Sequence, residues 1–212
     1  MRHDRLHSLT DAIFAIAMTL LVFNLKVPIL SKADTDSHPL WHALTQLTPE
    51  LLSFILSFAV LFIYWRAHNF IVSNLAQNID VPLTNINALF LLLIVFLPFN
   101  AELLGLYYSK DAAILLYGVN VIAISCTLIF MQYYIRKADT IGNNPNWTNT
   151  AHLDAYIRMA VPAVCAVLAI IIGLWNKDAA LILFTLTVIL GFSRTSVTLV
   201  RRIISRLPLR RT

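Results

Sequence analysis

The sequence predicts an all-α, polytopic membrane protein with six transmembrane helices. The chain has 212 residues, of which 58% are hydrophobic and only 13% are charged, about half the charged fraction of an average soluble domain. Its apolar residues gather in stretches of roughly 20, the length that an α-helix needs to cross the hydrocarbon core of a bilayer. Polar connections separate these stretches. We therefore expect a membrane domain whose surroundings are the lipid bilayer.

The six apolar stretches define the expected domain organisation. The spans are expected at about residues 9–28, 49–72, 82–104, 111–135, 155–175 and 179–200, in a single domain of residues 1–204, followed by a basic tail of residues 205–212. The first stretch follows Arg2 and Arg5, as a signal peptide would. It is longer than the usual apolar region of a signal peptide and lacks a small-residue cleavage site after it. We expect it to be a retained first span.

The distribution of basic residues predicts the topology. Six spans place both termini on the same side of the membrane. Twelve of the 16 Lys and Arg residues fall on the side of the termini and four on the other, and cytoplasmic segments carry the excess of positive charge. Both termini are therefore expected in the cytoplasm. Because the basic residues lie next to the spans, the net charge of +5 favours contact with an anionic leaflet, and no nucleic-acid partner is expected.

The positions of the ionisable residues exclude several classes of membrane protein. The middles of the six spans carry no charge, and the ionisable residues of the spans lie near helix ends: Asp11, Arg66, His68, Glu102, Arg158 and Arg194. This argues against a pump with a chain of intramembrane carboxylates and against a voltage sensor. The sequence also lacks a Thr-Val-Gly-Tyr-Gly carbonyl filter and the common zinc-protease and hydrolase motifs. We expect neither an enzyme nor a bound cofactor or metal.

The first stretch has one face that could line a pore. In a helix from Ile16 onward, Leu20 and Phe23 lie on the same face as Ile16, with Thr19 at its edge. The simpler interpretation is a helix that faces lipid or the protein core, with an N-terminal cap from Thr10 or Asp11. Periodicity alone favours this simpler interpretation, because apolar faces are common to membrane helices.

A motif at the start of this stretch resembles a known family. Arg5-x-x-x-Leu9-Thr10-Asp11, followed by an apolar run with Thr19-Leu20-Leu21, is similar to the Arg-x-x-x-Phe-Ser-Asp signature of the lysosomal transmembrane potassium channel family and its bacterial relatives. Tyr64-Trp65-x-x-His68 and, further on, Asn87 with Pro98-Phe99 add to the resemblance. The chain departs from the signature at Leu9 and Thr10, which keep the apolar bulk and the hydroxyl group.

The resemblance implies a specific assembly and pore. Bacterial members have six spans per subunit and form homotetramers in the bacterial plasma (inner) membrane, with the first helix of each subunit lining a central pore. By position in the motif, the narrowest ring falls on Ile16, with Thr19, Leu20 and Phe23 as further pore-lining residues. The permeant ions would be monovalent cations, chiefly potassium. A ring of isoleucines offers an ion no ligands, so it would act as a hydrophobic gate with modest selectivity.

The polar cluster at the start of the first stretch has two interpretations. Its residues could be a helix cap and interfacial anchors. Alternatively, they form a structural network that fastens the first helix to the second, because a buried aspartate needs partners and Asp11 could find them in Arg5 and His68. The residues of this predicted network are Arg5, Thr10, Asp11, Trp65 and His68.

The function predicted from these observations is a potassium-permeable, modestly potassium-selective cation channel with a hydrophobic constriction in place of a carbonyl filter. Two other classes stay open. A proton-coupled or small-solute transporter would need an internal repeat or broken helices at the membrane midplane, and neither is evident. A non-conducting membrane scaffold is the third class, and only a flux measurement separates it from a channel.

Overall fold

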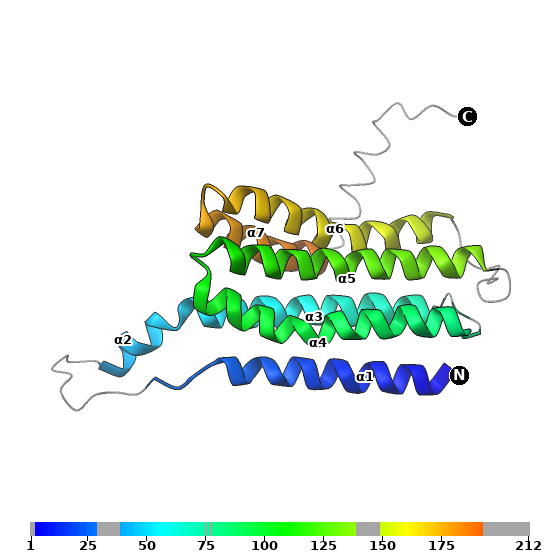
Figure 1. Ribbon diagram of the computed structural model, residues 1–212, viewed down its shortest axis with the longest axis horizontal. Coiled ribbons are helices and arrows are strands. Elements are labelled where there is room, and N and C mark those ends of the chain that lie inside the picture. The colour runs from blue at the N-terminus through cyan, green and yellow to red at the C-terminus, as the bar shows by residue number, and fades with distance from the viewer. Residues whose placement is uncertain (1–2, 29–38, 75, 77, 139–148, 193–212) are drawn as a thin grey trace, which may run out of the picture.

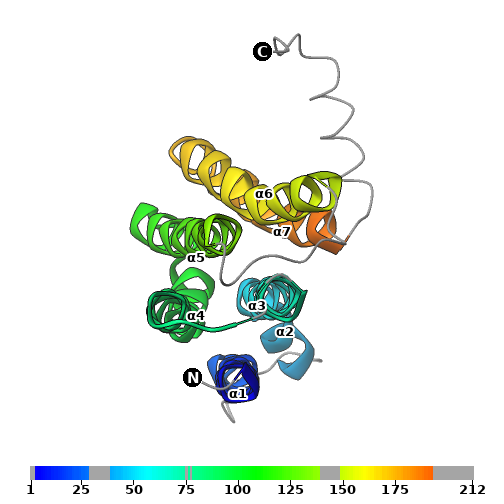
Figure 2. The same cartoon turned by 90° about the vertical axis from the view of Figure 1, so that its right-hand side faces the viewer.

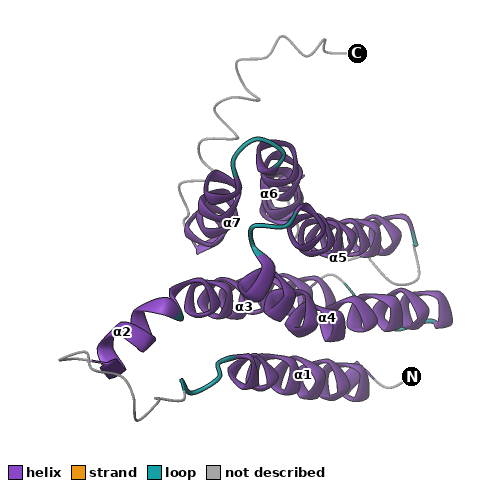
Figure 3. Ribbon diagram, turned by 60° about the vertical axis from the view of Figure 1, so that its left-hand side comes forward, coloured by secondary structure: helices purple, strands orange, loops and turns teal. Residues whose placement is uncertain are grey.

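The protein is a bundle of long helices in the computed structural model, which describes residues 3–28, 39–74, 76, 78–138 and 149–192. Across these residues every element of regular structure is a helix (Figure 1; Figure 3). The elements are α1 (His3–Leu20), the 3₁₀ turn η1 (Leu21–Asn24), α2 (Pro39–Gln46), α3 (Thr48–Asn74), α4 (Val81–Tyr107), α5 (Asp111–Lys137), α6 (Asn149–Gly173) and α7 (Lys177–Phe192). The predicted all-α class is confirmed.

Five helical segments in the described residues are long and apolar enough to cross a membrane. They are Arg5–Asn24, Thr48–Ser73, Val81–Tyr107, Asp111–Lys137 and Ala155–Gly173. The second to fifth predicted spans begin within one residue of the corresponding segments, whereas the first predicted span, 9–28, begins and ends four residues later than Arg5–Asn24. The sixth predicted span, residues 179–200, is described only as far as Phe192 in α7. The rest of that span and the predicted basic tail at 205–212 lie outside the described residues.

The first helix differs from its predicted bounds and cap. It begins at His3, so Thr10 and Asp11 lie inside α1 and cap nothing. The chain leaves the helix after η1, and Leu25 is already extended, with φ −87° and ψ 101°. The predicted end at Pro28 lies beyond the observed end at Asn24, the residue whose carbonyl a continued helix would bring against the Pro28 ring. The polar residues before Thr10 extend the helix at its start, and of these Arg5 and Ser8 are exposed.

The starts of α3 and α4 follow from local sequence signals. Thr48-Pro49-Glu50 opens α3, with proline in the first turn, where its missing N–H is tolerated. Asp80 caps α4, because its side chain accepts a hydrogen bond from the backbone N–H of Leu83 at 2.9 Å. The other carboxylate oxygen of Asp80 accepts a hydrogen bond from the hydroxyl of Tyr134 on α5 at 2.5 Å. This one residue therefore both starts α4 and joins it to α5.

The helices are arranged so that α1 lies at one edge of the bundle. Figure 1 shows α1 along one side, α3, α4 and α5 in the middle, and α6 and α7 on the far side. The end-on view in Figure 2 agrees, with α1 beside α3 and α4 and far from α6 and α7. The packing partners of α1 are α3 and α4, whereas α5 packs on both α4 and α6. One side of α1 therefore has no neighbour among the residues that the structure describes.

Buried hydroxyl groups join α3 to α5 inside the bundle. The hydroxyl of Tyr64 donates to the backbone carbonyl of Val121 at 2.9 Å and lies 2.9 Å from the hydroxyl of Ser125. Nearer the other end, the Ser57 and Tyr117 hydroxyls lie 3.2 Å apart. Because lipid offers no hydrogen-bond partners, polar groups at this depth must find them inside the protein. These contacts fix the register between α3 and α5, and α3 is also one of the two helices on which α1 packs.

Candidate pore-lining face of the first helix

The first helix has a buried face and an exposed face. The buried residues recur at helical spacing and pack against α3 and α4: Leu6, Thr10, Phe14, Ala17 and Leu21. The opposite face carries the predicted pore-lining residues. Ile16 is 58% exposed, Leu20 43% and Phe23 76%, and Thr19 is exposed beside them. The grouping predicted from helical periodicity therefore coincides with the side of α1 that the rest of the chain leaves uncovered.

The hydroxyl group of Thr19 is turned back onto its own helix. It donates a hydrogen bond to the backbone carbonyl of Ile16 at 2.9 Å. This is a common arrangement for threonine inside helices. The hydroxyl hydrogen is used in this contact, while the lone pairs of the oxygen stay free to accept from water or to approach a cation. On the face that carries Ile16, Thr19 therefore presents one hydrogen-bond acceptor, its hydroxyl oxygen, within an otherwise apolar surface.

An aromatic contact sets the depth at which α1 packs. The rings of Phe14 on α1 and Phe90 on α4 have centroids 5.8 Å apart. On α3, the imidazole of His68 stacks on Phe90 with centroids 5.0 Å apart and an interplanar angle of 8°. Phe90 thus lies in contact with both neighbouring helices. Because aromatic pairs at these separations contribute beyond their buried area, the three rings stabilise the junction of α1, α3 and α4.

The residues of the predicted polar network do not form one network in the described structure. The indole Nε1 of Trp65 donates to Oδ1 of Asp11 at 2.8 Å, which joins α1 to α3. His68 instead lies against α4, with Nε2 2.6 Å from Oδ1 of Asn87. The expected partnership of Asp11 with His68 is therefore replaced by two separate contacts. Asp11 is also exposed rather than buried, so its carboxylate needs only one partner in the protein, and the Trp65 side chain on α3 is sufficient.

The other two members of the predicted network contribute differently. Thr10 is buried at 1% exposure, and among the described residues its hydroxyl oxygen has no hydrogen-bond partner. It lies on the packed face of α1 and acts there through its shape. Arg5 is exposed, and no salt bridge joins it to an acid in the part of the chain that the structure describes. The predicted pairing of Arg5 with Asp11 is absent from this single chain.

Sequence reasoning missed three polar contacts around this helix. Ser73 on α3 lies 3.3 Å from the imidazole of His7. Asn87, noticed only through the family motif, is the partner of His68. Asn24 in η1 donates its side-chain amide to the backbone carbonyl of Pro98 at 3.0 Å. A polar residue inside an otherwise apolar stretch was the available signal for Asn24 and Asn87, because such a side chain needs a partner in lipid.

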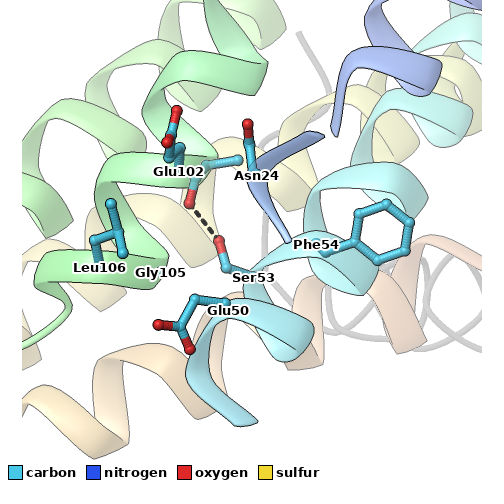
Figure 4. Close-up of a pocket in the computed structure, with 8 residues that line it drawn as sticks. Asn24, Glu50, Ser53, Phe54, Glu102, Gly105 and Leu106 are labelled. Carbon is cyan, nitrogen blue, oxygen red and sulfur yellow. Dashed lines mark hydrogen bonds between the residues drawn. The ribbon is translucent and has the colours of Figure 1, made fainter. Parts of the chain in front are cut away.

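A small pocket lies at the end of α1, beside the Asn24 contact. Its lining comes from η1, the start of α3 and the end of α4: Asn24, Glu50, Ser53, Phe54, Ala101, Glu102, Gly105 and Leu106 (Figure 4). The hydroxyl of Ser53 donates to the carbonyl of Ala101 at 2.6 Å, which is the dashed line in Figure 4. One carboxylate oxygen of Glu50 is buried without a hydrogen-bond partner among the described residues. The pocket is thus the polar end of the α1–α3–α4 junction.

Comparison with known proteins identifies the region that carries these features. Residues 5–98 match the family described as the endosomal/lysosomal potassium channel TMEM175. This range includes α1, α3 and the greater part of α4, together with the contacts of Asp11, His68 and Asn24. The features that distinguish the candidate face therefore fall inside the matched region.

Three bacterial relatives are described as potassium channels. The chain is 36% identical over 109 residues to one from Streptomyces collinus, and 38% identical over 109 residues to one from Chamaesiphon minutus. Each alignment covers 51% of this chain, and the chain spans about half the length of these two relatives, at 50% and 52%. A relative from a Chryseobacterium species is 29% identical over 153 residues, which cover 72% of this chain and 73% of that protein.

Two solved structures share the fold. The crystal structure of a lysosomal potassium-selective channel TMEM175 homolog from Chamaesiphon minutus aligns with a TM-score of 0.74 at 23% identity, over 88% of this chain and 94% of that one. A variant of the potassium channel MtTMEM175, solved with a nanobody fusion protein, aligns with a TM-score of 0.61 at 17% identity, over 96% and 94%. At these identities the likeness concerns the helical arrangement.

The matched family consists of ion channels, which are not enzymes, in agreement with the expectation from sequence. The apolar helices and the family match together make the protein a multi-pass membrane protein. The resemblance seen in the Arg5–Asp11 motif is confirmed by the family match over residues 5–98 and by the potassium channels among the relatives. Over residues 5–98, which are less than half of its length, the chain is similar to the TMEM175 family of potassium channels.

Proposed function

We propose that the chain is the subunit of a potassium-permeable, modestly potassium-selective cation channel whose constriction is hydrophobic. The observation that carries the proposal is the uncovered apolar face of α1, on which Ile16, Leu20 and Phe23 stand exposed at the edge of the bundle. The family match over residues 5–98 and the potassium channels among the relatives support it. In a homotetramer, four such faces meet around one axis and enclose a pore.

The same proposal includes the assembly and orientation expected from the sequence. Each subunit has six spans in one domain of residues 1–204, followed by a basic tail at 205–212. The channel lies in the bacterial plasma (inner) membrane with both termini in the cytoplasm, because the excess of Lys and Arg lies on their side. The edge position of α1 supports this assembly, since a pore helix must be reachable by copies of itself (Figure 2).

The constriction at Ile16 would act through dehydration. A ring of four isoleucine side chains offers no oxygen ligands, so an ion that enters it loses hydration without replacement. Potassium sheds part of its hydration shell more readily than sodium, which gives a moderate preference. A small widening of the ring admits water and lowers the barrier steeply, because dewetting depends on pore width. Thr19, adjacent to Ile16, adds acceptor oxygens next to the dry ring.

The polar residues at the start of α1 have a structural role in this proposal. The contacts of Asp11 with Trp65 and of His68 with Asn87 hold α1 and α4 against α3. Thr10 fills the packed face, and Arg5 anchors the exposed start of the helix. Their part is to place the pore-lining face correctly, whereas the ion meets the residues further along α1, which are apolar except for Thr19.

A liposome flux assay tests the proposal. Purified full-length protein is reconstituted with a potassium gradient and a pH-sensitive dye, with valinomycin and a proton ionophore as controls. A channel gives passive potassium flux that a gradient alone drives. Flux that requires a second coupled ion would identify a transporter, and absence of flux beside a normal valinomycin response would identify a scaffold. Either of these two results contradicts the proposal.

A further inference from the structure

At the end of α1, beside the buried Leu21 of η1, lies a polar side-chain contact that sequence reasoning did not anticipate. Asn24 is the last residue of η1, and its side-chain amide donates to the carbonyl of Pro98 at 3.0 Å. The chain is extended from Leu25 onward. The first half of α1 is fixed by its buried face and by the Asp11–Trp65 contact. At this end the Asn24 contact defines where the 3₁₀ turn lies.

The acceptor of this contact lies at the weakest point of α4. Pro98 is inside the helix, and proline has no N–H to donate to the carbonyl of Ile94 one turn earlier. Helices bend most readily where a proline interrupts the hydrogen-bond ladder. Asn24 is therefore attached to α4 at the residue about which the two halves of that helix can tilt.

The part of α4 beyond Pro98 is tied to α3. The hydroxyl of Ser53 donates to the carbonyl of Ala101 at 2.6 Å. The backbones also approach closely, since a Cβ added at Gly105 would lie 3.2 Å from the Cα of Glu50. The start of α3 and the end of α4 thus behave as one unit. A tilt of this unit about Pro98 is transmitted to α1 through Asn24.

Asn24 is adjacent to the most exposed of the proposed pore-lining residues. Phe23 is 76% exposed and lies in the same four-residue turn. Successive residues of a 3₁₀ turn are about 120° apart, so a fixed direction for the Asn24 side chain fixes the direction of Phe23. The pocket next to Asn24 leaves space on its other side (Figure 4), so the hydrogen bond is the polar restraint on the direction of the Asn24 side chain, while the buried Leu21 anchors the other end of the turn.

We infer that Asn24 is a positioning residue, which through its hydrogen bond to the Pro98 carbonyl sets the orientation of Phe23 at the end of the pore. The inference rests on the proposed channel function, in which Phe23 faces the ion path. It adds a residue outside the pore-lining set that controls the width of the pore end. It also names α4 as the element whose tilt would change that width.

The experiment measures the accessibility of position 23 in full-length protein. Cys126 and Cys165 are replaced by Ser and Ala, and Phe23→Cys is introduced for modification by a charged methanethiosulfonate reagent in liposomes. Asn24→Asp, which has the same shape but no donor, should change the modification rate about 5-fold, the factor that one net hydrogen bond of about 1 kcal/mol supplies. Asn24→Gln keeps the amide donor and should give a smaller change than Asn24→Asp.

A matched control uses Trp175→Cys, an exposed position at the turn between α6 and α7 at the same end of the bundle (Figure 1). Its modification rate should not respond to Asn24→Asp. If Asn24→Asp fails to fold, Asn24→Ala removes the same donor without adding charge. An unchanged rate at position 23, or an equal change at both positions, overturns the inference.

A parallel potassium flux measurement separates this inference from the proposed function. Parent protein that conducts no potassium contradicts the channel itself. If the parent conducts, Asn24→Asp should also shift the potassium-to-sodium flux ratio, whereas a variant that merely loses stability would lower the flux of both ions together. A conducting parent whose Asn24→Asp variant keeps both the ratio and the labelling rate contradicts the role of Asn24 alone.

Discussion

The indole nitrogen of Trp65 lies 2.8 Å from a carboxylate oxygen of Asp11 and donates a hydrogen bond from α3 to α1. The acceptor is charged, so the contact is stronger than a hydrogen bond between neutral groups. Asp11 is exposed in the single chain, which reduces the net contribution because water competes for its oxygens. The contact therefore orients α1 on α3 at a modest net free energy.

Trp65→Phe should destabilise the folded protein by about 1 kcal/mol, because the ring is kept and the donor is lost. We expect a lower yield of assembled protein and a lower melting temperature in detergent, with the potassium-to-sodium ratio unchanged. Asp11→Asn keeps an acceptor oxygen and should have a smaller effect. Trp175→Phe, at an exposed indole, is the control. A changed ion preference at normal stability would place this contact in the pore.

Ile16→Asn should raise conductance and lower the potassium preference. Four amide side chains would stabilise water in the constriction and reduce the dewetting barrier. Ile55→Asn on α3 is a matched control, since Ile55 is 59% exposed and Ile16 is 58% exposed. A control variant at Leu21 would be unsuitable, because the Leu21 side chain is fully buried. Bi-ionic potential measurements give the potassium-to-sodium permeability ratio. If Ile55→Asn alters this ratio and Ile16→Asn does not, the pore is not lined by Ile16.

Asn87→Ala should cost about 1–3 kcal/mol of stability, because it leaves the buried imidazole of His68 without its partner at 2.6 Å. Asn120→Ala is the natural comparison. Asn120 is buried as well, but its amide nitrogen has no partner among the described residues, so its removal should cost less. Thermal unfolding of the purified protein measures both. Equal losses would mean that the His68–Asn87 contact contributes nothing beyond burial.

Gly118→Ala should destabilise the packing of α5 on α6 by about 1–3 kcal/mol, the usual cost of overpacking. A Cβ at position 118 would lie 2.7 Å from Cδ1 and 2.8 Å from Cγ1 of Ile170, so the Ile170 side chain or one of the two helices must shift. Ile170→Ala removes both atoms, and the double variant should be more stable than the sum of the two single effects predicts. Strict additivity in the unfolding data would show that the two sites are independent.

The sequence predicts the helical class and most span positions well because these depend on local composition. Apolar stretches of sufficient length, the Thr48-Pro49-Glu50 start and the proline after Asp80 each act within a few residues. The grouping of Ile16, Leu20 and Phe23 on one side of α1 likewise needs only helical geometry. The bounds of α1 were harder to predict, because the helix starts among polar residues that a search for apolar stretches leaves out.

Partner choice among the polar residues could not be predicted from the sequence. Asp11 had Arg5 and His68 as candidates on the correct side, and the structure pairs it with Trp65. The choice depends on how α1, α3 and α4 are rotated against one another, and packing of rings such as Phe14 and Phe90 decides this rotation. The Asn24–Pro98 contact spans 74 positions, and no local pattern encodes such a pair.

The edge position of α1 has a consequence for the order of synthesis. The helix leaves the ribosome before its packing partners α3 and α4, which are complete only when Tyr107 has been added. Until then α1 can cross the bilayer but has no surface on which to dock, because membrane helices insert individually before they associate. Docking of α1 is therefore a late step in biogenesis, and substitutions on its buried face should leave insertion intact while they delay maturation.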